Sequence, residues 1–258
     1  MDLSRRDALR LGAGLTVAGV AGCVEQRVTE RTTRDDSSVV WPLSPQVGGA
    51  LSAPEFEAYV DRMADQYGEH GVWGRDAEES DDFETAYVSR LAAVGETPAN
   101  PEGTEVSLNP DDVDPDAPLL FCDACVAVYR TDEDLYRYWL WAAADPADSR
   151  LLRDVSLAGL TVGATFPAGG TLIEGANPTV ADGEATATLV GPPSATFAVR
   201  GGELDTFSAR GDAGDYRLRW RGDVEETQSI NAVCEEQRPG EFEFSWRIEA
   251  GYRFVDTV

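Results

Sequence analysis

The alternation of apolar and charged side chains near the C-terminal end constrains the fold of this 258-residue chain more than any other feature. Between positions 216 and 221, three large apolar side chains alternate with Arg217, Arg219 and Arg221. From position 241 to 248, aromatic and aliphatic residues alternate with charged or small polar ones. A period of two is typical of a strand with one buried face. The pattern therefore predicts a β-rich fold.

Earlier apolar runs predict further strands, joined by turn sequences. The runs 119–130 and 135–144 flank Thr131–Asp134 and predict a hairpin. The second run has large residues on both faces, which predicts a central strand covered on each side. Pro167–Gly170 and the Gly201-Gly202 pair predict two more hairpins. Short strands separated by turns favour a sandwich or open barrel of mostly antiparallel strands.

One amphipathic helix is expected near the N-terminal end of the folded part. Ser52 and Glu55 form a capping-box pattern, and Pro54 suits the first turn. Apolar residues then recur at helical spacing up to Gly68, so we expect a helix over 53–67. The predicted class is therefore α+β and mainly β. Residues 83–94 fit a helix or a strand equally well, and 95–118 predict a long surface loop.

The first residues carry two motifs of protein export. Arg5 and Arg6 precede an apolar run, 11–21, which ends in Val-Ala-Gly-Cys23. This resembles a twin-arginine export signal joined to a lipobox, with Ala8 where the pattern usually has a large apolar residue. A run of this length is too short to span a bilayer. The resemblance implies a signal peptide over 1–22, export by the twin-arginine translocase, and a lipid on Cys23 that anchors the protein to the extracellular face of the cell membrane. Residues 23–40 are polar and predict a flexible tether, and 41–258 predict a single folded cargo domain.

The charge balance is extreme. The chain has 47 acidic and 21 basic residues, for a net charge of -26, and every basic residue is arginine. This composition resembles proteins of extremely halophilic archaea. In molar salt the Debye length falls to about 3 Å, so dense carboxylates no longer repel one another over distance. Binding to nucleic acid is not expected, because it needs a basic patch.

Three cysteines remain besides Cys23. Cys122 and Cys125 form a C-x-x-C motif, and Cys234 lies far along the chain. A disulfide, either within the motif or to Cys234, is the favoured interpretation. The alternatives are free thiols, a redox pair of thioredoxin type, and a zinc site in which His70 or an acid would supply the fourth ligand. His70 is the only histidine, and a surface or capping role is favoured for it. No cofactor is expected.

Asp112, Asp114 and Asp116 have the spacing of the first ligands of a calcium loop. Ala117 stands where such a loop needs glycine, so a solvated acidic loop is favoured.

The row formed by Arg217, Arg219 and Arg221 admits two interpretations. It could bind an anion, or it could form a cross-strand ladder with Glu241 and Glu243, which is favoured.

These features favour a non-catalytic, lipid-anchored binding or scaffold module outside the cell, with a ligand that the sequence does not specify. The alternative is an exported thiol redox or metal-dependent protein that uses Cys122 and Cys125.

Overall fold

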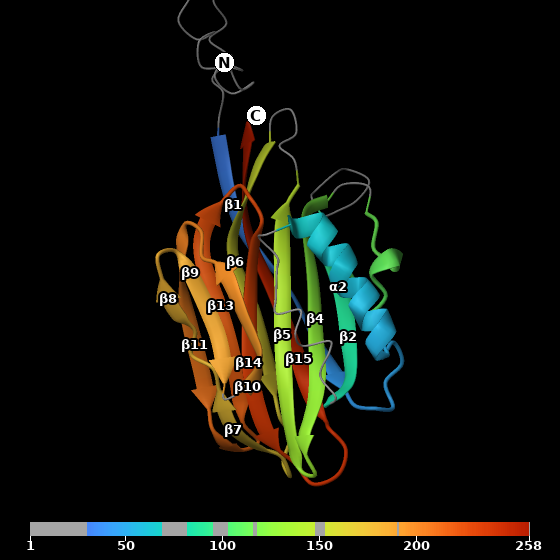
Figure 1. The fold of residues 1–258 in the computed structure, drawn as a ribbon. Coiled ribbons are helices and arrows are strands. Elements are labelled where there is room, and N and C mark those ends of the chain that lie inside the picture. Colours follow the sequence, from blue (N-terminus) through green and yellow to red (C-terminus); the bar gives the residue numbers. More distant parts are fainter. Residues whose placement is uncertain are drawn as a thin grey trace, which may run out of the picture.

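The fold is a β-sandwich with one helix on an outer face, described by a computed structural model for residues 30–68, 82–94, 103–115, 118–147, 153–189 and 191–257 (Figure 1). The first main sheet has, in spatial order, β1 (Glu30–Leu43), β15 (Phe244–Thr257), β6 (Arg153–Thr165), β13 (Asp215–Val224) and β11 (Gly202–Ala209). The second has β12 (Gly211–Asp212), β7 (Thr171–Gly175), β14 (Gln228–Gln237), β5 (Leu135–Pro146), β4 (Pro118–Asp132), β2 (Phe83–Val94) and β3 (Gly103–Ser107). The predicted β-rich α+β class is confirmed.

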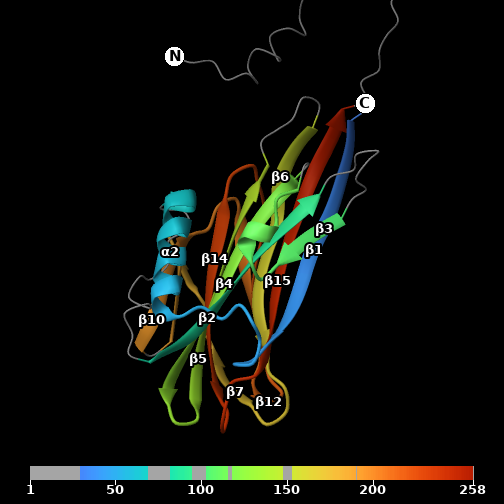
Figure 2. The ribbon, with the colours of Figure 1, turned by 90° about the vertical axis from the view of Figure 1, so that its right-hand side faces the viewer.

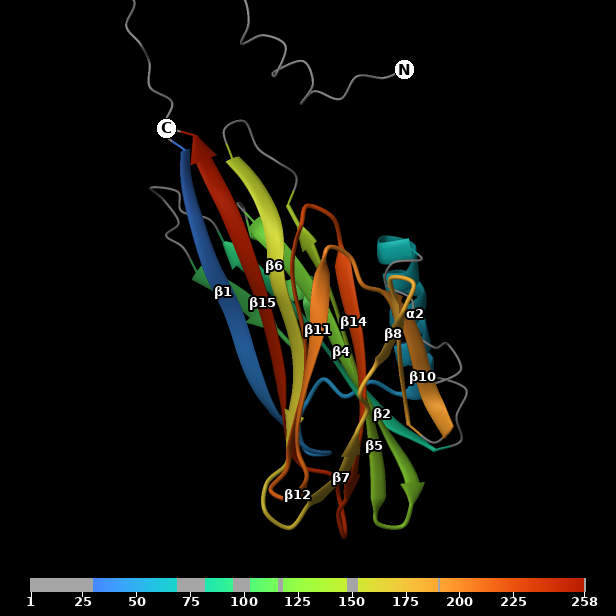
Figure 3. The same ribbon diagram turned by 90° about the vertical axis from the view of Figure 1, so that its left-hand side faces the viewer.

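The five-stranded sheet follows the alternation of the sequence. Tyr216, Leu218 and Trp220 of β13 are buried in the core between the sheets, while the intervening arginines point outward. On β15, Trp246 and Ile248 also enter this core. β1, β15 and β6 lie side by side and are seen from their outer side in Figure 3. The predicted period of two is therefore correct for both strands.

The seven-stranded sheet is buried on both faces around β5, as its sequence predicts. Tyr138 and Leu140 belong to the core between the sheets, and Trp139 and Trp141 to a second cluster under the helix. The helix α2 (Ala53–Tyr67) lies across this second face (Figure 2). Its ring contacts with the sheet include Phe56 against Trp139, at 6.3 Å between centroids, and Tyr67 against Trp141, at 5.9 Å.

The ends of α2 are those that the sequence predicts. The Glu55 carboxylate accepts hydrogen bonds from the Ser52 amide at 2.9 Å and from the Ser52 hydroxyl at 2.6 Å, and these bonds lower the pKa of Glu55. Pro54 stands in the first turn, and Gly68 caps the C-terminal end with a φ of 58°. The predicted helix boundaries are confirmed.

A small third sheet completes the fold. The sheet has the order β10 (Gly191–Ala198), β9 (Glu184–Leu189) and β8 (Thr179–Ala181), and its buried residues extend the core between the main sheets. Gln228 of β14 is bonded to the end of β10: its side chain donates to the Ala198 carbonyl at 2.6 Å and accepts from the Arg200 amide at 2.9 Å.

Both predicted glycine-turn hairpins are wrong. β6 belongs to the five-stranded sheet and β7 to the seven-stranded sheet, so Pro167–Gly170 carries the chain from one sheet to the other. Gly201 does have a positive φ, 51°, but β10 pairs with β9 whereas β11 pairs with β13. A turn sequence shows that the chain bends, and long-range packing decides which strands pair.

Two other expectations are corrected. β1 begins at Glu30, inside the range predicted as a flexible tether, because its residues pair with β15 from Glu30↔Thr257 onward. The predicted loop 95–118 contains β3 and the 3-10 helix η3 (Pro110–Asp112). The ambiguous range 83–94 is strand β2.

The start of β1 and the end of β15 lie at the same end of the sandwich (Figure 1). Within the part of the chain that the structure describes, no helix has the length and apolar character needed to cross a membrane.

Candidate functional site

The three cysteines are free thiols buried in the sandwich, so the favoured disulfide is wrong. Cys122 faces the core between the sheets and Cys125 faces α2, because residues three apart on a strand lie on opposite faces. Cys122 aligns through Ala144 with Gln228, and Cys234 lies further along β14, roughly 20 Å away at about 3.3 Å per residue. A disulfide needs Cα atoms within about 7 Å.

Burial also makes these thiols unreactive. It raises the pKa of Cys122, Cys125 and Cys234 well above the usual value, and nearby Asp123 raises that of Cys122 further. The attacking species in thiol chemistry is the thiolate, which these surroundings disfavour. The redox and zinc interpretations would need exposed or converging thiols.

The other metal candidates gain no support in the described ranges. No group of three or more His, Cys, Asp or Glu side chains there is placed to hold a metal ion. Asp112 lies in η3, where it accepts a hydrogen bond from the Asn109 amide group at 3.1 Å. Asp116 and His70 lie outside the described residues.

The arginine row of β13 is paired with carboxylates, but not with those predicted. Arg217 pairs with Asp215, Arg219 with Glu249 at 3.2 Å, and Arg221 with Asp205 at 3.9 Å. Glu241 and Glu243 precede β15, which is separated from β13 by β6, so the predicted ladder is wrong. The row is not a positive patch, since each arginine has an acidic neighbour.

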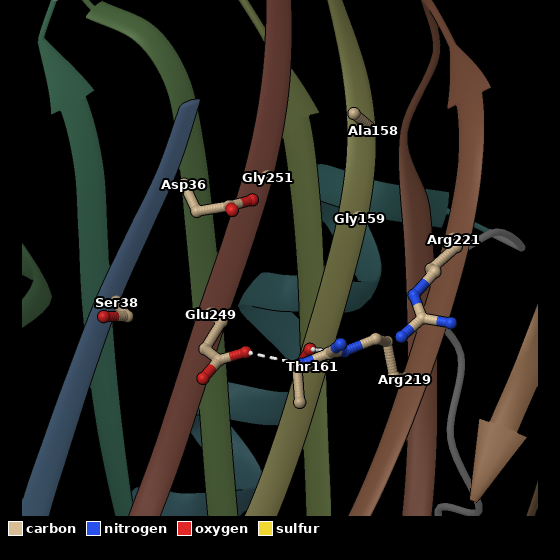
Figure 4. A pocket seen from close by; sticks show the side chains of 9 residues that line it. All are labelled: Asp36, Ser38, Ala158, Gly159, Thr161, Arg219, Arg221, Glu249 and Gly251. Carbon is tan, nitrogen blue, oxygen red and sulfur yellow. Dashed lines mark hydrogen bonds and ion pairs between the residues drawn. The ribbon is translucent and has the colours of Figure 1, made fainter. Parts of the chain in front are cut away.

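Two of these arginines border a groove on the outer face of the five-stranded sheet (Figure 4). Its volume is about 250 Å³, and it crosses four strands. Register aligns Asp36, Gly251, Gly159 and Arg221 in one row. Ser38, Glu249, Thr161 and Arg219 form the next row.

Glycine forms the floor of this groove. Gly251 and Gly159 are neighbours on β15 and β6, so no side chain rises between Asp36 and Arg221 in their row. In the next row Thr161 lies between, and Arg219 reaches across it to Glu249. A Cβ on Gly159 would lie 3.6 Å from the Trp220 carbonyl, which is ordinary contact, so a larger residue would project into the hollow. A Cβ on Gly251 would collide with an Asp36 oxygen, because that carboxylate leans over the glycine. Glycine inside a strand often marks such a close approach.

The groove carries both signs of charge. Asp36 and Glu249 lie on one side, and Arg219 and Arg221 on the other. Arg219 donates from Nε to the Thr161 hydroxyl at 3.2 Å as well as to Glu249, so its guanidinium is held in place. Arg221 is about half exposed, and its ion pair with Asp205 is long. The arrangement offers one fixed and one adaptable guanidinium opposite two carboxylates.

A second polar cluster is buried beneath α2. Asp123 is fully buried and accepts hydrogen bonds from Arg90 at 2.8 and 3.0 Å. It also accepts from the Tyr67 hydroxyl at 2.6 Å and from Gln66 at 3.2 Å. Burial and the Asp123 charge raise the pKa of Tyr67. These contacts join the last turn of α2 to β2 and β4, which is a structural task.

Sequence reasoning missed most of these residues. Asp36 fell inside the predicted tether, and Gly159 and Gly251 were not singled out. Glycine within an apolar strand pattern was the available signal for the groove. Asp123, a lone acid in a long apolar run, was the signal for the buried cluster.

Arg5, Arg6 and Cys23, which carry the export and lipidation motifs, lie outside the described residues. The chain matches no protein-family model, no curated protein and no solved structure in the three comparisons made.

Proposed function

We propose that this protein is a lipid-anchored, non-catalytic binding module on the outer face of the cell membrane, which holds a small polar ligand in the groove on its five-stranded sheet. The observation that carries the binding role is the glycine-floored hollow with Arg219 and Arg221 on one side and carboxylates on the other. The anchoring role rests on the export and lipobox motifs that end at Cys23.

Rigid surroundings support binding at this groove. Its floor is backbone in the middle of a hydrogen-bonded sheet, and Trp220 and Trp246 pack fully buried on the other side of that sheet. A site held by such a scaffold needs little reorganisation when a ligand enters. The volume suits a ligand smaller than the drug-sized molecules that occupy pockets of about 300–1,000 Å³.

The groove is also open to water. Asp36 and Ser38 are exposed, and Arg221 is about half exposed. Sites of acid–base catalysis usually exclude water. An open, charged hollow is better suited to reversible capture than to chemistry.

The proposed anchor would hold the folded domain close to the membrane. Six residues separate Cys23 from the start of β1 at Glu30, and even fully extended they span only about 20 Å. The end of the sandwich where β1 begins would therefore stay close to the membrane. The groove, which lies on a face of the sheet and not at its end, would face away from the membrane normal.

The anchor is tested by fractionation of cells. Cys23→Ser should leave the protein unprocessed or release it into the soluble exported fraction. Replacing Arg5 and Arg6 by lysine should retain the precursor inside the cell. A Cys23→Ser protein that is still processed and membrane-bound contradicts the lipid anchor.

The binding role is tested by equilibrium dialysis of the full-length protein, extracted in detergent, against a defined mixture of amino acids, short peptides, sugars and carboxylic acids. Gly159→Val should fill the hollow and abolish retention of whichever solute the wild type holds. Ser245→Val, on the same outer face but beyond the groove, is the matched control and should retain it. If Gly159→Val and the wild type retain the same solutes equally, the groove is not the binding site.

A further inference from the structure

We infer that the ligand of the groove is a compact zwitterion, with its carboxylate on Arg221 and Arg219 and its ammonium group on Asp36 and Glu249. This inference rests on the proposed binding function and names its ligand class. It starts from the row Asp36–Gly251–Gly159–Arg221, which places opposite charges at the two ends of a bare glycine floor.

The separation of the charges fits a small molecule. Asp36 and Arg221 are three strands apart, or roughly 14 Å between backbones at about 4.8 Å per strand. The Asp36 carboxylate leans over Gly251, about two strand spacings, or roughly 10 Å, from the β13 backbone. The Arg221 guanidinium lies over β13 (Figure 4), so a similar distance separates the two charged groups. Two charge-assisted hydrogen bonds of about 2.8 Å each would leave roughly 4 Å between the ligand's own charges. That separation suits an α- or β-amino acid.

The local charge favours a zwitterion over a simple anion. The four charged side chains of the groove sum to zero, whereas the whole chain has a net charge of -26. An anion would be repelled by the protein and would also face Asp36 and Glu249. A cation would be attracted over the whole surface and would face Arg219 and Arg221. Only a ligand with both charges can avoid repulsion from either side of the groove.

Both arginines have donors that such a ligand can use. Arg221 holds Asp205 only at 3.9 Å and is about half exposed, so its planar fork can turn toward a carboxylate. Arg219 is fixed by Thr161 and Glu249 and offers its remaining donors. A carboxylate such as Asp36 has about four acceptor positions, so it can receive an ammonium group in addition to other contacts.

Three probes of nearly equal size separate the ligand classes. L-alanine carries both charges, L-alaninamide only the positive one, and N-acetyl-L-alanine only the negative one. Calorimetry at pH 6 is run across a KCl series that starts at the lowest concentration at which the protein is folded. At its molar end a Debye length of about 3 Å removes the long-range bias of the protein's net charge. L-alanine, or the dipeptide alanylalanine, should bind at least about tenfold more tightly than either singly charged probe, as expected for loss of one charge-assisted contact.

Two exposed substitutions assign the two ends. Arg221→Gln should lower L-alanine affinity by about tenfold and should not lower L-alaninamide affinity. Asp36→Asn should lower L-alanine affinity similarly and should not lower N-acetyl-L-alanine affinity. Ser245→Val should alter neither, and an unchanged melting temperature shows that each variant is folded.

The outcomes distinguish this inference from the proposed function. Equal binding of L-alanine and N-acetyl-L-alanine would make the groove an anion site, and equal binding of L-alaninamide would make it a cation site. Failure of both zwitterions to bind also overturns the inference. If the wild type nevertheless retains a sugar or a carboxylic acid in dialysis and the Gly159→Val variant does not, the binding function stands with another ligand class. If no solute depends on the groove, both fail.

Discussion

The two main sheets each present an outer face with arginine–carboxylate pairs, but one face is covered and the other is open. On the seven-stranded sheet, α2 covers the pair of Arg90 with Asp123, whose carboxylate is 0% exposed. On the five-stranded sheet, Arg219 and Glu249 are 37% and 23% exposed beside the groove. The same chemical pair therefore occurs in two dielectric environments within one fold.

The difference assigns the two pairs different tasks. A carboxylate without water must receive all its hydrogen bonds from the protein, so Asp123 depends on the last turn of α2 as well as on Arg90. The open pair exchanges readily with water and salt and adds little stability. Its side chains remain accessible to a ligand. The covered face thus holds the fold together, while the open face is suited to binding.

The largest effect is expected from Asp123→Ala, which leaves Arg90 without its carboxylate and removes the acceptor of Tyr67. Loss of one partner of a buried pair costs about 3–5 kcal/mol. The free energy of unfolding from urea titration in molar KCl measures it. Tyr67→Phe is the milder control, at about 1–2 kcal/mol, because it removes one neutral donor. A cost below 1 kcal/mol for Asp123→Ala would mean that the covered pair behaves like the open one.

A third carboxylate, Glu236, is buried between the sheets and makes the stability of the protein depend on pH. Glu236 accepts hydrogen bonds from Tyr138 at 2.6 Å and from Arg238 at 2.9 Å, yet burial raises its pKa above the usual value of 4.5. A raised pKa means that the folded state binds the proton more tightly than the unfolded state does. The stability from this group is complete below about pH 4.5 and is lost as the pH rises through the folded-state pKa.

Glu236→Gln should remove this pH dependence. The free energy of unfolding of the variant, measured in molar KCl, should therefore rise relative to that of the wild type as the pH rises from 4 to 7. Glu249→Gln on the open face is the control for a change of charge alone. A difference between Glu236→Gln and the wild type that stays constant over this range would contradict the prediction.

The covered face should open more readily than the core between the sheets, and the cysteines report this directly. Ser52→Ala removes the hydroxyl bonded to Glu55 and should weaken α2 by about 1 kcal/mol. Labelling of Cys125, which requires α2 to detach, should become about fivefold faster. Labelling of Cys122 and Cys234 should not change, because they lie between the sheets.

Mass spectrometry after reaction with a thiol probe resolves the three sites within one protein, so Cys122 is an internal control. Denatured, processed protein should give three free thiols besides the acylated Cys23. Equal acceleration of Cys122 and Cys125 would show that α2 and the sandwich open together.

The sequence predicted local structure better than it predicted which strands and side chains pair with one another. Alternation identified the buried faces of β13 and β15, and the Ser52–Glu55 pattern located α2, because both signals depend on neighbours in the chain. The hairpin predicted at Pro167–Gly170 is wrong because strand pairing depends on distant residues. The C-x-x-C motif was open to a better prediction: its flanks read as strand, and residues three apart on a strand face opposite ways.

The groove was harder to anticipate because its residues come from four strands. Arg219 and Arg221 were recognised as an unusual row, but their partners Glu249 and Asp205 were not. Gly159 and Gly251 become neighbours only through the register of β6 with β15. A period-two pattern gives the face of a residue, not what lies beside it on the next strand.

The smallest effect is expected at the open pair. Glu249→Gln keeps the shape of the side chain but removes a charge that Arg219 and Arg247 contact at 3.2 and 3.0 Å. Because both arginines are partly exposed, the cost should be at most about 1 kcal/mol at the lowest KCl concentration at which the protein is folded. It should shrink toward zero in molar KCl, where the Debye length is about 3 Å. The cost of Asp123→Ala should persist in molar KCl, because ions do not enter the space under α2. Urea titrations of both variants across the same salt series measure the contrast. An undiminished cost for Glu249→Gln in molar salt would mean that this pair is held as tightly as the covered one, and its side chains would then be poor candidates for capturing a ligand.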